Sequence, residues 1–286
     1  MNDSIVLSAP GARARCELAE YEGARGRRLR YAVVRARPER QALLYLHGIE
    51  SHGGWFLAAA EGLAERGTTT YLLDRRGSGL NLEPAPGDAP SAAVLLEDVR
   101  RFCTHARLER PSLVGLSWGG KLAVASALDQ PDGFRALVLV TPGLLPRVGY
   151  SLPERIGIAL ALVLGGRARF HVPIEPEMFT RTPPFLDYIV NDPLRLQRVS
   201  ARFLLASHRL DRWIRSSVQE LSVPVLLFLA GHDRIVDNER TRALLERLPP
   251  GQLRTRLYED ATHSIQLEQT ERLVRDVSGF LEELPC

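Results

Sequence analysis

The residues best suited to chemistry form one short stretch, Gly115-Leu116-Ser117-Trp118-Gly119. A Gly-x-Ser-x-Gly pattern that follows an apolar run and precedes helix-forming residues is typical of a sharp strand-to-helix turn. Glycines at both ends allow the turn to be tight, because a Cβ at either position would clash. The helix that follows would bring unpaired N–H groups and the positive end of its dipole near the hydroxyl. The stretch therefore predicts that Ser117 is a nucleophile at the start of a helix.

A serine hydroxyl is a weak nucleophile and needs a histidine base, which in turn needs an acid to fix its tautomer. Among seven histidines, His263 lies in a loop between a predicted last strand and a closing helix. The acid we expect is Asp233, at the end of the strand predicted over residues 223–230. Asp237 lies close enough to compete for this role. The order Ser117, Asp233, His263 is one of the known chain orders of such triads.

The reaction also needs hydrogen-bond donors for the oxyanion that develops on the attacked carbonyl. We expect these to be backbone N–H groups, one from Trp118 and one from Ile49 in the loop after an early strand. His47 and His52 flank that loop, but no third ligand follows at a spacing that would hold a metal ion. We therefore expect no metal site and predict that His47 braces the loop. His232 is expected to be structural, pointing away from the acid.

Apolar runs and helix-like segments alternate along most of the chain. Strands are expected at residues 42–46, 68–73, 111–116, 136–140, 223–230 and 253–258, and helices at 55–66, 91–106, 118–130, 238–248 and 268–284. Residues 13–35 are predicted to form a hairpin that turns at 22–26. Such alternation predicts an α/β fold, with a mostly parallel central sheet and helices on both faces. In this class ligands bind at the carboxyl ends of the strands, where Asp74, Ser117 and the loop after residue 46 all fall.

The alternation breaks between residues 144 and 217, where seven prolines interrupt short amphipathic segments. We predict a helical cap over the serine there, inserted after the sixth strand and without a buried strand. Residues 1–143 and 218–286 would then form the core domain. The apolar run Ile156 to Leu164 is expected either to face the pocket or to pack against the core.

Composition narrows the class of protein. The chain has 286 residues and a net charge of +3, which gives no reason to expect nucleic-acid binding. Three cysteines (Cys16, Cys103 and Cys286) and no recognisable signal sequence predict a cytoplasmic protein. No apolar run reaches the roughly 20 residues of a membrane span. The glycine clusters near Gly53 and Gly77 lack phosphate-loop and dinucleotide spacing, so we expect no cofactor.

Taken together, these motifs resemble the α/β-hydrolase superfamily, in particular its branch of monoacylglycerol lipases, lysophospholipases and S33 serine aminopeptidases. The stretches that carry the resemblance are residues 47–52, 74–79, 115–120, 231–233 and 262–263. The resemblance implies hydrolysis of a small-molecule carboxylic ester through an acyl-enzyme, with a monoacylglycerol or lysophospholipid as the substrate type. Two departures weaken the transfer of substrate preference: Leu116 replaces a common histidine, and Leu80-Asn81 replaces a common serine.

Other functions remain open from the sequence. The same triad serves peptidases, amidases, thioesterases and lactonases, and proline iminopeptidases would use cap carboxylates such as Glu154, Glu175 or Glu177. A non-catalytic binding protein on this fold is the alternative from another class, although such proteins commonly lose part of the triad. The apolar run near Ile156 leaves transient contact with a lipid surface open, and the oligomeric state is not predicted.

Overall fold

The computed structural model describes residues 10–12 and 16–284. Within these residues, eight strands form one sheet in the order β1-β2-β4-β3-β5-β6-β9-β10. Only the pairs β1–β2 and β2–β4 are antiparallel. The strands are β1 (Glu17–Glu22), β2 (Arg28–Val34), β3 (Gln41–Leu46), β4 (Thr68–Leu73), β5 (Ser112–Leu116), β6 (Leu137–Val140), β9 (Val225–Ala230) and β10 (Leu253–Tyr258).

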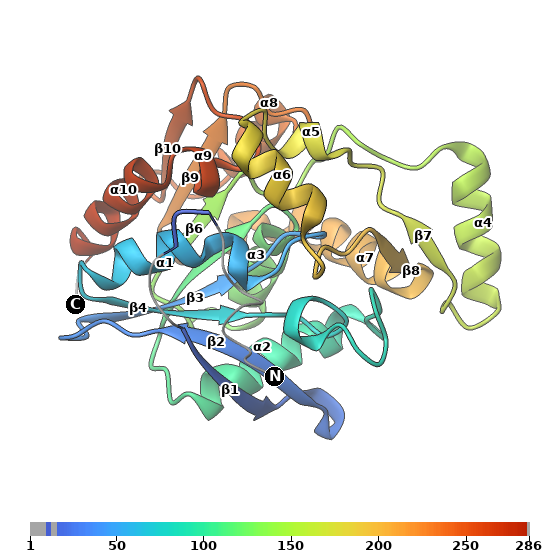
Figure 1. The fold of residues 1–286 in the computed structure, drawn as a ribbon, viewed down its shortest axis with the longest axis horizontal. Helices are drawn as coiled ribbons and strands as arrows, with labels where there is room; N and C mark the ends of the chain where they lie inside the picture. The colour runs from blue at the N-terminus through green and yellow to red at the C-terminus, as the bar shows by residue number, and fades with distance from the viewer. Residues whose placement is uncertain (1–9, 13–15, 285–286) are drawn as a thin grey trace.

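Helices cover both faces of this sheet, and each face has its own apolar core (Figure 1). One face packs against α1 (Leu57–Ala64), α9 (Ile265–Glu268) and α10 (Thr270–Glu282). The other packs against α2 (Ala92–His105), α3 (Trp118–Asp129) and α8 (Asn238–Leu245). Four- to six-residue runs such as Leu137–Val140 are entirely buried, as expected for strands covered on both sides.

The chain reverses its winding direction at β3. From β3 it moves to β4 on one side and then crosses to β5 on the other. Leu46 at the end of β3 pairs with Gly115 near the end of β5, so the loops that follow these two strands are neighbours. Such a switch point opens a crevice at the carboxyl edge of a parallel sheet. The fold thereby brings Ile49 and Ser117 to the same edge.

The predicted elements are confirmed within about three residues at their ends. The hairpin is also present as β1 and β2, although residues 13–15 of the predicted range lie outside the described residues. The predicted closing helix over residues 268–284 is α10, and α9 is a separate short helix before it, because Gln269 between them has non-helical dihedral angles (φ −130°, ψ 37°).

Residues 144–217 join β6 to β9 and stand at one side of the sheet (Figure 1). This segment contains α4 (Leu152–Val163), β7 (Arg169–His171), α5 (Pro176–Phe179), α6 (Pro183–Asn191), β8 (Arg198–Ser200) and α7 (Ala201–Ser217). The expectation that it has no buried strand was wrong: β7 and β8 pair in a small antiparallel sheet, and Val199 in β8 is fully buried. Three-residue strands are too short to show an alternating pattern in the sequence.

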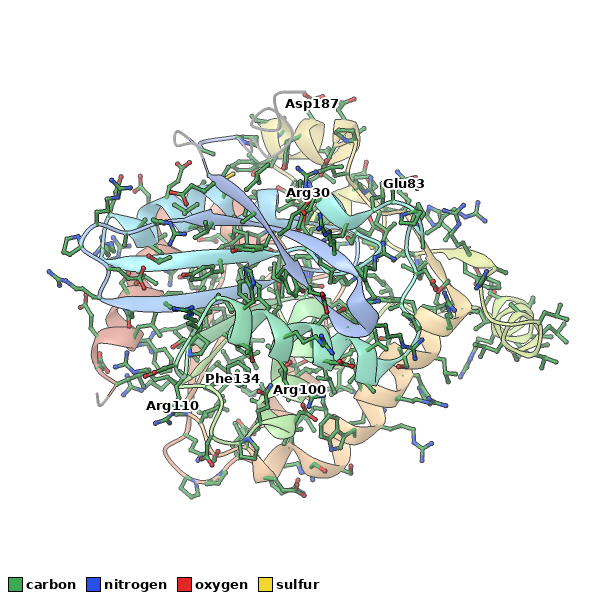
Figure 2. The ribbon with its side chains drawn as sticks, turned by 90° about the horizontal axis from the view of Figure 1, so that it is seen from below. Arg30, Glu83, Arg100, Arg110, Phe134 and Asp187 are labelled. Atoms are coloured by element: carbon green, nitrogen blue, oxygen red, sulfur yellow. The ribbon has the colours of Figure 1, made fainter. Side chains whose placement is uncertain are left out.

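The apolar run of α4 was expected either to face the pocket or to pack against the core, and the structure shows neither arrangement for its exposed side chains. The helix projects from the body of the molecule, and Figure 2 views it nearly end-on with side chains radiating around it. Four large apolar side chains of the helix, Leu152, Ile156, Leu160 and Val163, are 54 % to 85 % exposed, as is Leu164 just after the helix. They neither line the pocket nor pack on the core. The sequence period showed an apolar stripe but could not show what covers it.

Candidate active site

Ser117 lies in the turn between β5 and α3, with a φ of +50° and a ψ of −118°. Positive φ is sparsely populated by residues with a Cβ, so the surrounding structure must hold this conformation in place. Two backbone hydrogen bonds do so. The Ser117 N–H donates to the Val140 carbonyl (3.0 Å), and the Gly143 N–H donates to the Ser117 carbonyl (2.7 Å). The serine is 6 % exposed and lines a pocket.

The two glycines of the motif are required by close packing. A Cβ on Gly119 would lie 1.9 Å from the Leu46 carbonyl oxygen, and a Cβ on Gly115 would lie 2.5 Å from the Gly120 Cα. Both neighbours are backbone atoms that cannot move aside. The helix α3 therefore begins directly against the end of β3, which sets the serine beside the loop after that strand.

His263 and Asp233 meet at the same edge of the sheet. His263 Nδ1 lies 2.9 Å from Asp233 Oδ2, and both side chains are buried. The other carboxylate oxygen, Oδ1, accepts the backbone N–H groups of Ile235 (2.8 Å) and Val236 (2.9 Å). These bonds fix the carboxylate and leave Oδ2 for the imidazole. Nε2 of His263 is buried and has no hydrogen-bond partner among the described residues.

Asp237, the competing acid, has a different role in the structure. It is the N-cap of α8, where its Oδ1 accepts the backbone N–H of Arg240 (3.0 Å). His232 is exposed, and its backbone N–H donates to the Ala261 carbonyl. Between Asp233 and Asp237, therefore, Asp233 is the acid that contacts His263.

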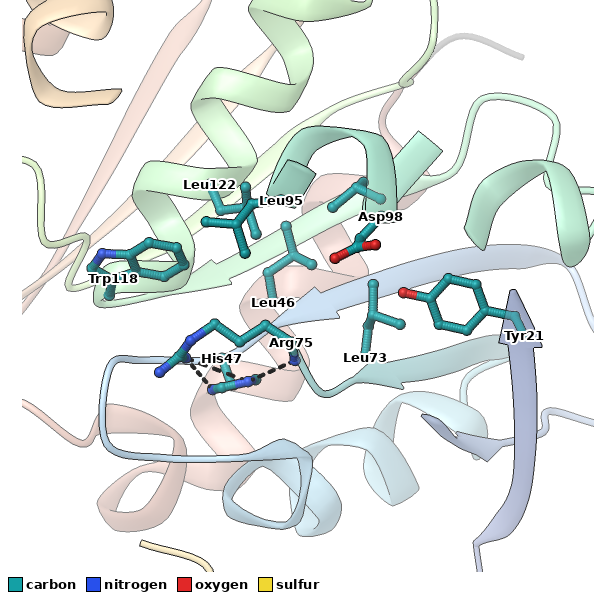
Figure 3. A pocket seen from close by; sticks show the side chains of 10 residues that line it. Tyr21, Leu46, His47, Leu73, Arg75, Leu95, Asp98, Trp118 and Leu122 are labelled. Atoms are coloured by element: carbon teal, nitrogen blue, oxygen red, sulfur yellow. Dashed lines mark hydrogen bonds between the residues drawn. The ribbon is translucent and has the colours of Figure 1, made fainter. Parts of the chain in front are cut away.

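The loop after β3 is fastened by His47 and Arg75. The Arg75 backbone N–H donates to His47 Nε2 (3.1 Å), so Nδ1 is the protonated nitrogen and donates to the Gly48 carbonyl (2.8 Å). The guanidinium of Arg75 folds over the imidazole (Figure 3) and donates to the carbonyls of Gly48 (2.7 Å) and Ile49 (2.5 Å). Burial, and then the charge of Arg75, hold the pKa of His47 well below 6.5.

His47 therefore braces this loop, as expected, whereas the part played by Arg75 was not predicted. Burial lowers the pKa of Arg75 to about 9, so it stays a cation at neutral pH. The guanidinium also lies 5.1 Å from the centre of the Trp118 ring, within the range of a cation–π contact. Arg75 thus contacts both segments that carry the expected oxyanion donors. In the sequence, the position of Arg75 just after the buried strand β4 was the feature that could have pointed to this role.

The inserted segment makes buried polar contacts with this loop region. Asp192, after α6, accepts from His52 Nε2 (3.0 Å) and from Trp55 Nε1 (2.6 Å). Arg195 pairs with Glu50 at 2.8 Å, and both side chains are at most 6 % exposed. Burial raises the pKa of Glu50 to about 7, although Arg195 opposes that rise. The imidazole of His52 is therefore bonded to the Asp192 carboxylate of the inserted segment.

The segment also packs against the histidine loop. The Phe179 carbonyl at the end of α5 accepts from the Thr262 hydroxyl (2.8 Å) and the Ser264 N–H (2.9 Å). The Phe179 ring lies edge-on to His263, with 5.9 Å between ring centres. The inserted segment thus contacts the loops that carry Glu50 and His263.

A pocket of about 460 Å³ lies beside Ser117, between the sheet edge and the inserted segment. The loop after β3 contributes Ile49 to its lining, and the turn into α3 contributes Ser117 and Trp118. The inserted segment contributes apolar side chains such as Val172 and Leu204. A pocket of this size and mixed lining suits a small organic ligand. No cluster of three or more potential metal ligands occurs among residues 10–12 and 16–284. In the same residues no helix is both long and apolar enough to cross a bilayer.

Comparisons with known proteins give a consistent result. A family model described as "Serine aminopeptidase, S33" matches residues 37–270. The monoacylglycerol lipase of Mycolicibacterium smegmatis is 25 % identical over 268 residues, which cover 90 % of this chain and 93 % of the relative. The human monoglyceride lipase is 25 % identical over 243 residues, covering 81 % and 78 % of the two chains.

Among solved structures, a soluble variant of monoglyceride lipase from Saccharomyces cerevisiae, in complex with a substrate analogue, superimposes with a TM-score of 0.84. It is 17 % identical, and the match covers 97 % of this chain and 99 % of the yeast chain. At this identity the likeness shows the fold. The predicted α/β-hydrolase fold is therefore confirmed.

Proposed function

Because the chain belongs to the serine aminopeptidase S33 family of hydrolases, we propose that it is a serine esterase that cleaves a monoacylglycerol-type carboxylic ester. The observation that carries this proposal is the strained Ser117 turn, which lies at one sheet edge with the bonded pair Asp233–His263. Two relatives that match 81 % or more of this chain are named monoacylglycerol lipase and monoglyceride lipase, which favours an ester over an amide.

In the proposed mechanism, Ser117 attacks the ester carbonyl while His263 takes its proton. Asp233 accepts the Nδ1–H of His263, so Nε2 is the basic nitrogen. Because Nε2 has no hydrogen-bond partner within the described part of the chain, it is available for the serine proton. His263 then protonates the leaving alcohol, which departs and leaves an acyl group on Ser117. Water attacks the acyl-enzyme with the same histidine as base and releases the acid.

The backbone N–H groups of Ile49 and Trp118 are the proposed oxyanion donors. Trp118 is the first residue of α3, so its N–H has no partner within the helix and lies at the positive end of the helix dipole. Ile49 is held by the bond from Arg75 to its carbonyl, which fixes the peptide plane next to the proposed donor. Both residues line the pocket with Ser117.

Residues 144–217 are proposed to be the cap that closes this site. Their contacts with Glu50 and the histidine loop support that role. The exposed stripe of α4 fits a cap that touches a lipid surface, because a contiguous apolar patch on a soluble protein marks an interaction site. Such contact would let the enzyme take a sparingly soluble ester directly from an aggregate.

An aminopeptidase reaction has less support in the site. Glu154 is bound by the Ser151 N–H (2.8 Å) and hydroxyl (2.7 Å) in a capping box at the start of α4, and it is exposed. Glu175 and Glu177 do not contribute to the lining of the pocket. None of these carboxylates is placed to hold the free amine of a peptide in the pocket.

The proposal is tested with p-nitrophenyl esters of increasing acyl length and with 1-monoacylglycerols, using Ser117→Ala as the control. We expect turnover by the wild type, loss of at least about 10³-fold in the variant, and an optimum length that matches the pocket. Hydrolysis of aminoacyl amides in preference to every ester would contradict the proposal.

Contact of α4 with lipid is tested separately. Leu160→Gln should lower activity on monoacylglycerol in vesicles or emulsions and leave activity on soluble p-nitrophenyl acetate unchanged. Leu257→Gln is the matched control, because Leu257 is a leucine of similar exposure (49 %) on β10 of the central sheet, outside residues 144–217. Equal effects of the two changes on the aggregated substrate would refute a role for α4.

A further inference from the structure

One wall of the pocket carries a buried pair of opposite charges that the proposed mechanism does not use. Lys121 lies on α3 one helical turn after Ser117, and Asp211 lies on α7 of the inserted segment. Lys121 Nζ is 2.7 Å from Asp211 Oδ1, with side chains 5 % and 16 % exposed. Both residues line the same pocket as Ser117.

Ser207, one turn before Asp211 on α7, completes the cluster. Its Oγ accepts hydrogen bonds from Lys121 Nζ (2.9 Å) and from Trp118 Nε1 (3.0 Å). A hydroxyl oxygen has two lone pairs, so both are used. No described residue accepts a hydrogen bond from the hydroxyl hydrogen of Ser207, which also lines the pocket. That hydrogen is therefore available to a ligand.

A second unpaired hydroxyl lies in the same pocket. The Oη atom of Tyr150 is buried and has no hydrogen-bond partner among the described residues. Burial raises the pKa of Tyr150 to about 12, so the group is a neutral donor at physiological pH. A purely alkyl ligand would leave both this hydroxyl and that of Ser207 without partners, which is costly in a buried site.

A purely stabilising role explains the Lys121–Asp211 pair less well than a ligand-binding role does. Removing two charges from water costs several kcal/mol per ion, and a well-packed apolar pair often stabilises a protein as well or better. If the pair only tied α7 to α3, apolar side chains would serve. Burial lowers the pKa of the Lys121 ammonium while Asp211 opposes this change. The cluster is polar but close to neutral in net charge, which suits a hydroxyl group better than an anion.

We propose that Lys121, Ser207 and Asp211 form a polar subsite that binds a hydroxyl group of the substrate. The substrate oxygen would accept from Ser207, and its hydrogen would be donated to the Asp211 carboxylate. The enzyme should then prefer hydroxyl-bearing esters to alkyl esters of the same size. This inference rests on the proposed ester hydrolysis and names the chemistry by which the pocket selects its substrate.

The hydroxyl can belong to the acyl chain or to the alcohol, and two pairs of substrates distinguish these sources. Four helical residues span about 6 Å, which about five or six carbon atoms can bridge. The acyl arm therefore compares p-nitrophenyl 6-hydroxyhexanoate with its isostere, p-nitrophenyl heptanoate. The alcohol arm compares 1-butyrylglycerol with 2-methylbutyl butyrate. The measured quantity is the ratio of kcat/KM within each pair.

We expect the wild type to prefer the hydroxyl ester in at least one arm, by about 10- to 100-fold. The double variant Lys121→Met/Asp211→Leu removes both charges together and should bring this ratio to about one or below. Ser207→Ala should lower it partially. Ser216→Ala is the matched control, since Ser216 is exposed on the last turn of α7 and should leave the ratio unchanged.

A wild type without preference in either arm, or a double variant with the wild-type ratio, would overturn the proposal. Calorimetric binding of the two p-nitrophenyl esters to Ser117→Ala keeps the test independent of turnover. Selective binding of the hydroxyl ester without turnover by the wild type would contradict the proposed hydrolysis but support the subsite. Turnover of both esters with equal binding and equal kcat/KM would support the proposed hydrolysis and contradict the subsite.

Discussion

Replacing Asp233 by asparagine should remove most of the catalytic rate for a reason that the hydrogen bonds define. Oδ1 accepts two backbone N–H groups, from Ile235 and Val236, so the asparagine carbonyl must take that place. The amide NH₂ would then face His263 Nδ1 in the position of the present 2.9 Å bond. Because NH₂ cannot accept a proton, His263 would hold its proton on Nε2 and could no longer deprotonate Ser117. We expect kcat to fall by about 10³- to 10⁴-fold, equivalent to roughly 4 to 5.5 kcal/mol of barrier.

The assay is steady-state hydrolysis of a short p-nitrophenyl ester, with a thermal melt to show that the variant is folded. Asp237→Asn is the matched control. It changes the same atoms four residues away, and asparagine caps a helix as well as aspartate, so the bond from Arg240 should persist. Activity of this control should stay within about twofold of wild type. A large loss in Asp237→Asn together with a small loss in Asp233→Asn would refute the assignment of the acid.

Three further predictions concern the structure around the site. Arg75→Met should lower kcat by about 10- to 100-fold with little change in KM, because the carbonyl of Ile49 loses its charged donor; an unchanged kcat would contradict this. Gly119→Ala should prevent folding or abolish activity, as judged by circular dichroism and turnover, since its Cβ would meet the Leu46 carbonyl. The pKa of His47 is lower in the folded than in the unfolded chain, so its contribution to stability is present above about pH 6.5 and is lost at lower pH. In urea unfolding, the advantage of wild type over His47→Gln should therefore shrink by up to about 1.4 kcal/mol per pH unit below 6.5, and a pH-independent difference would be the contrary result.

The sequence was sufficient for the core because strands such as β6 and β9 are short, apolar and fully buried, and helices of a different period separate the strands. Val225–Ala230 is buried throughout, and such a run has few other interpretations in an alternating chain. The candidate residues could be selected for a related reason. Ser117, Asp233 and His263 each follow a strand, and parallel strands end at one edge of the sheet.

The features that could not be predicted from the sequence arise from contacts between segments that are distant in the chain. The role of Arg75 arises from its bonds to the carbonyls of Gly48 and Ile49, 27 and 26 residues earlier in the chain. Lys121 is the only lysine in the sequence, but nothing there points to its partner Asp211, which lies on α7, 90 residues later. Leu160 is exposed because none of the described elements covers it, and a local hydrophobic pattern cannot reveal this.

The central claim is that Ser117 is an activated nucleophile, and covalent labelling tests it most directly. The wild-type protein is treated with a fluorophosphonate, and the modified peptide is located by mass spectrometry. We predict a single adduct on Ser117 that is absent in Ser117→Ala and forms much more slowly in His263→Ala. A folded wild-type protein that fails to react, or that reacts at another serine, would contradict the account.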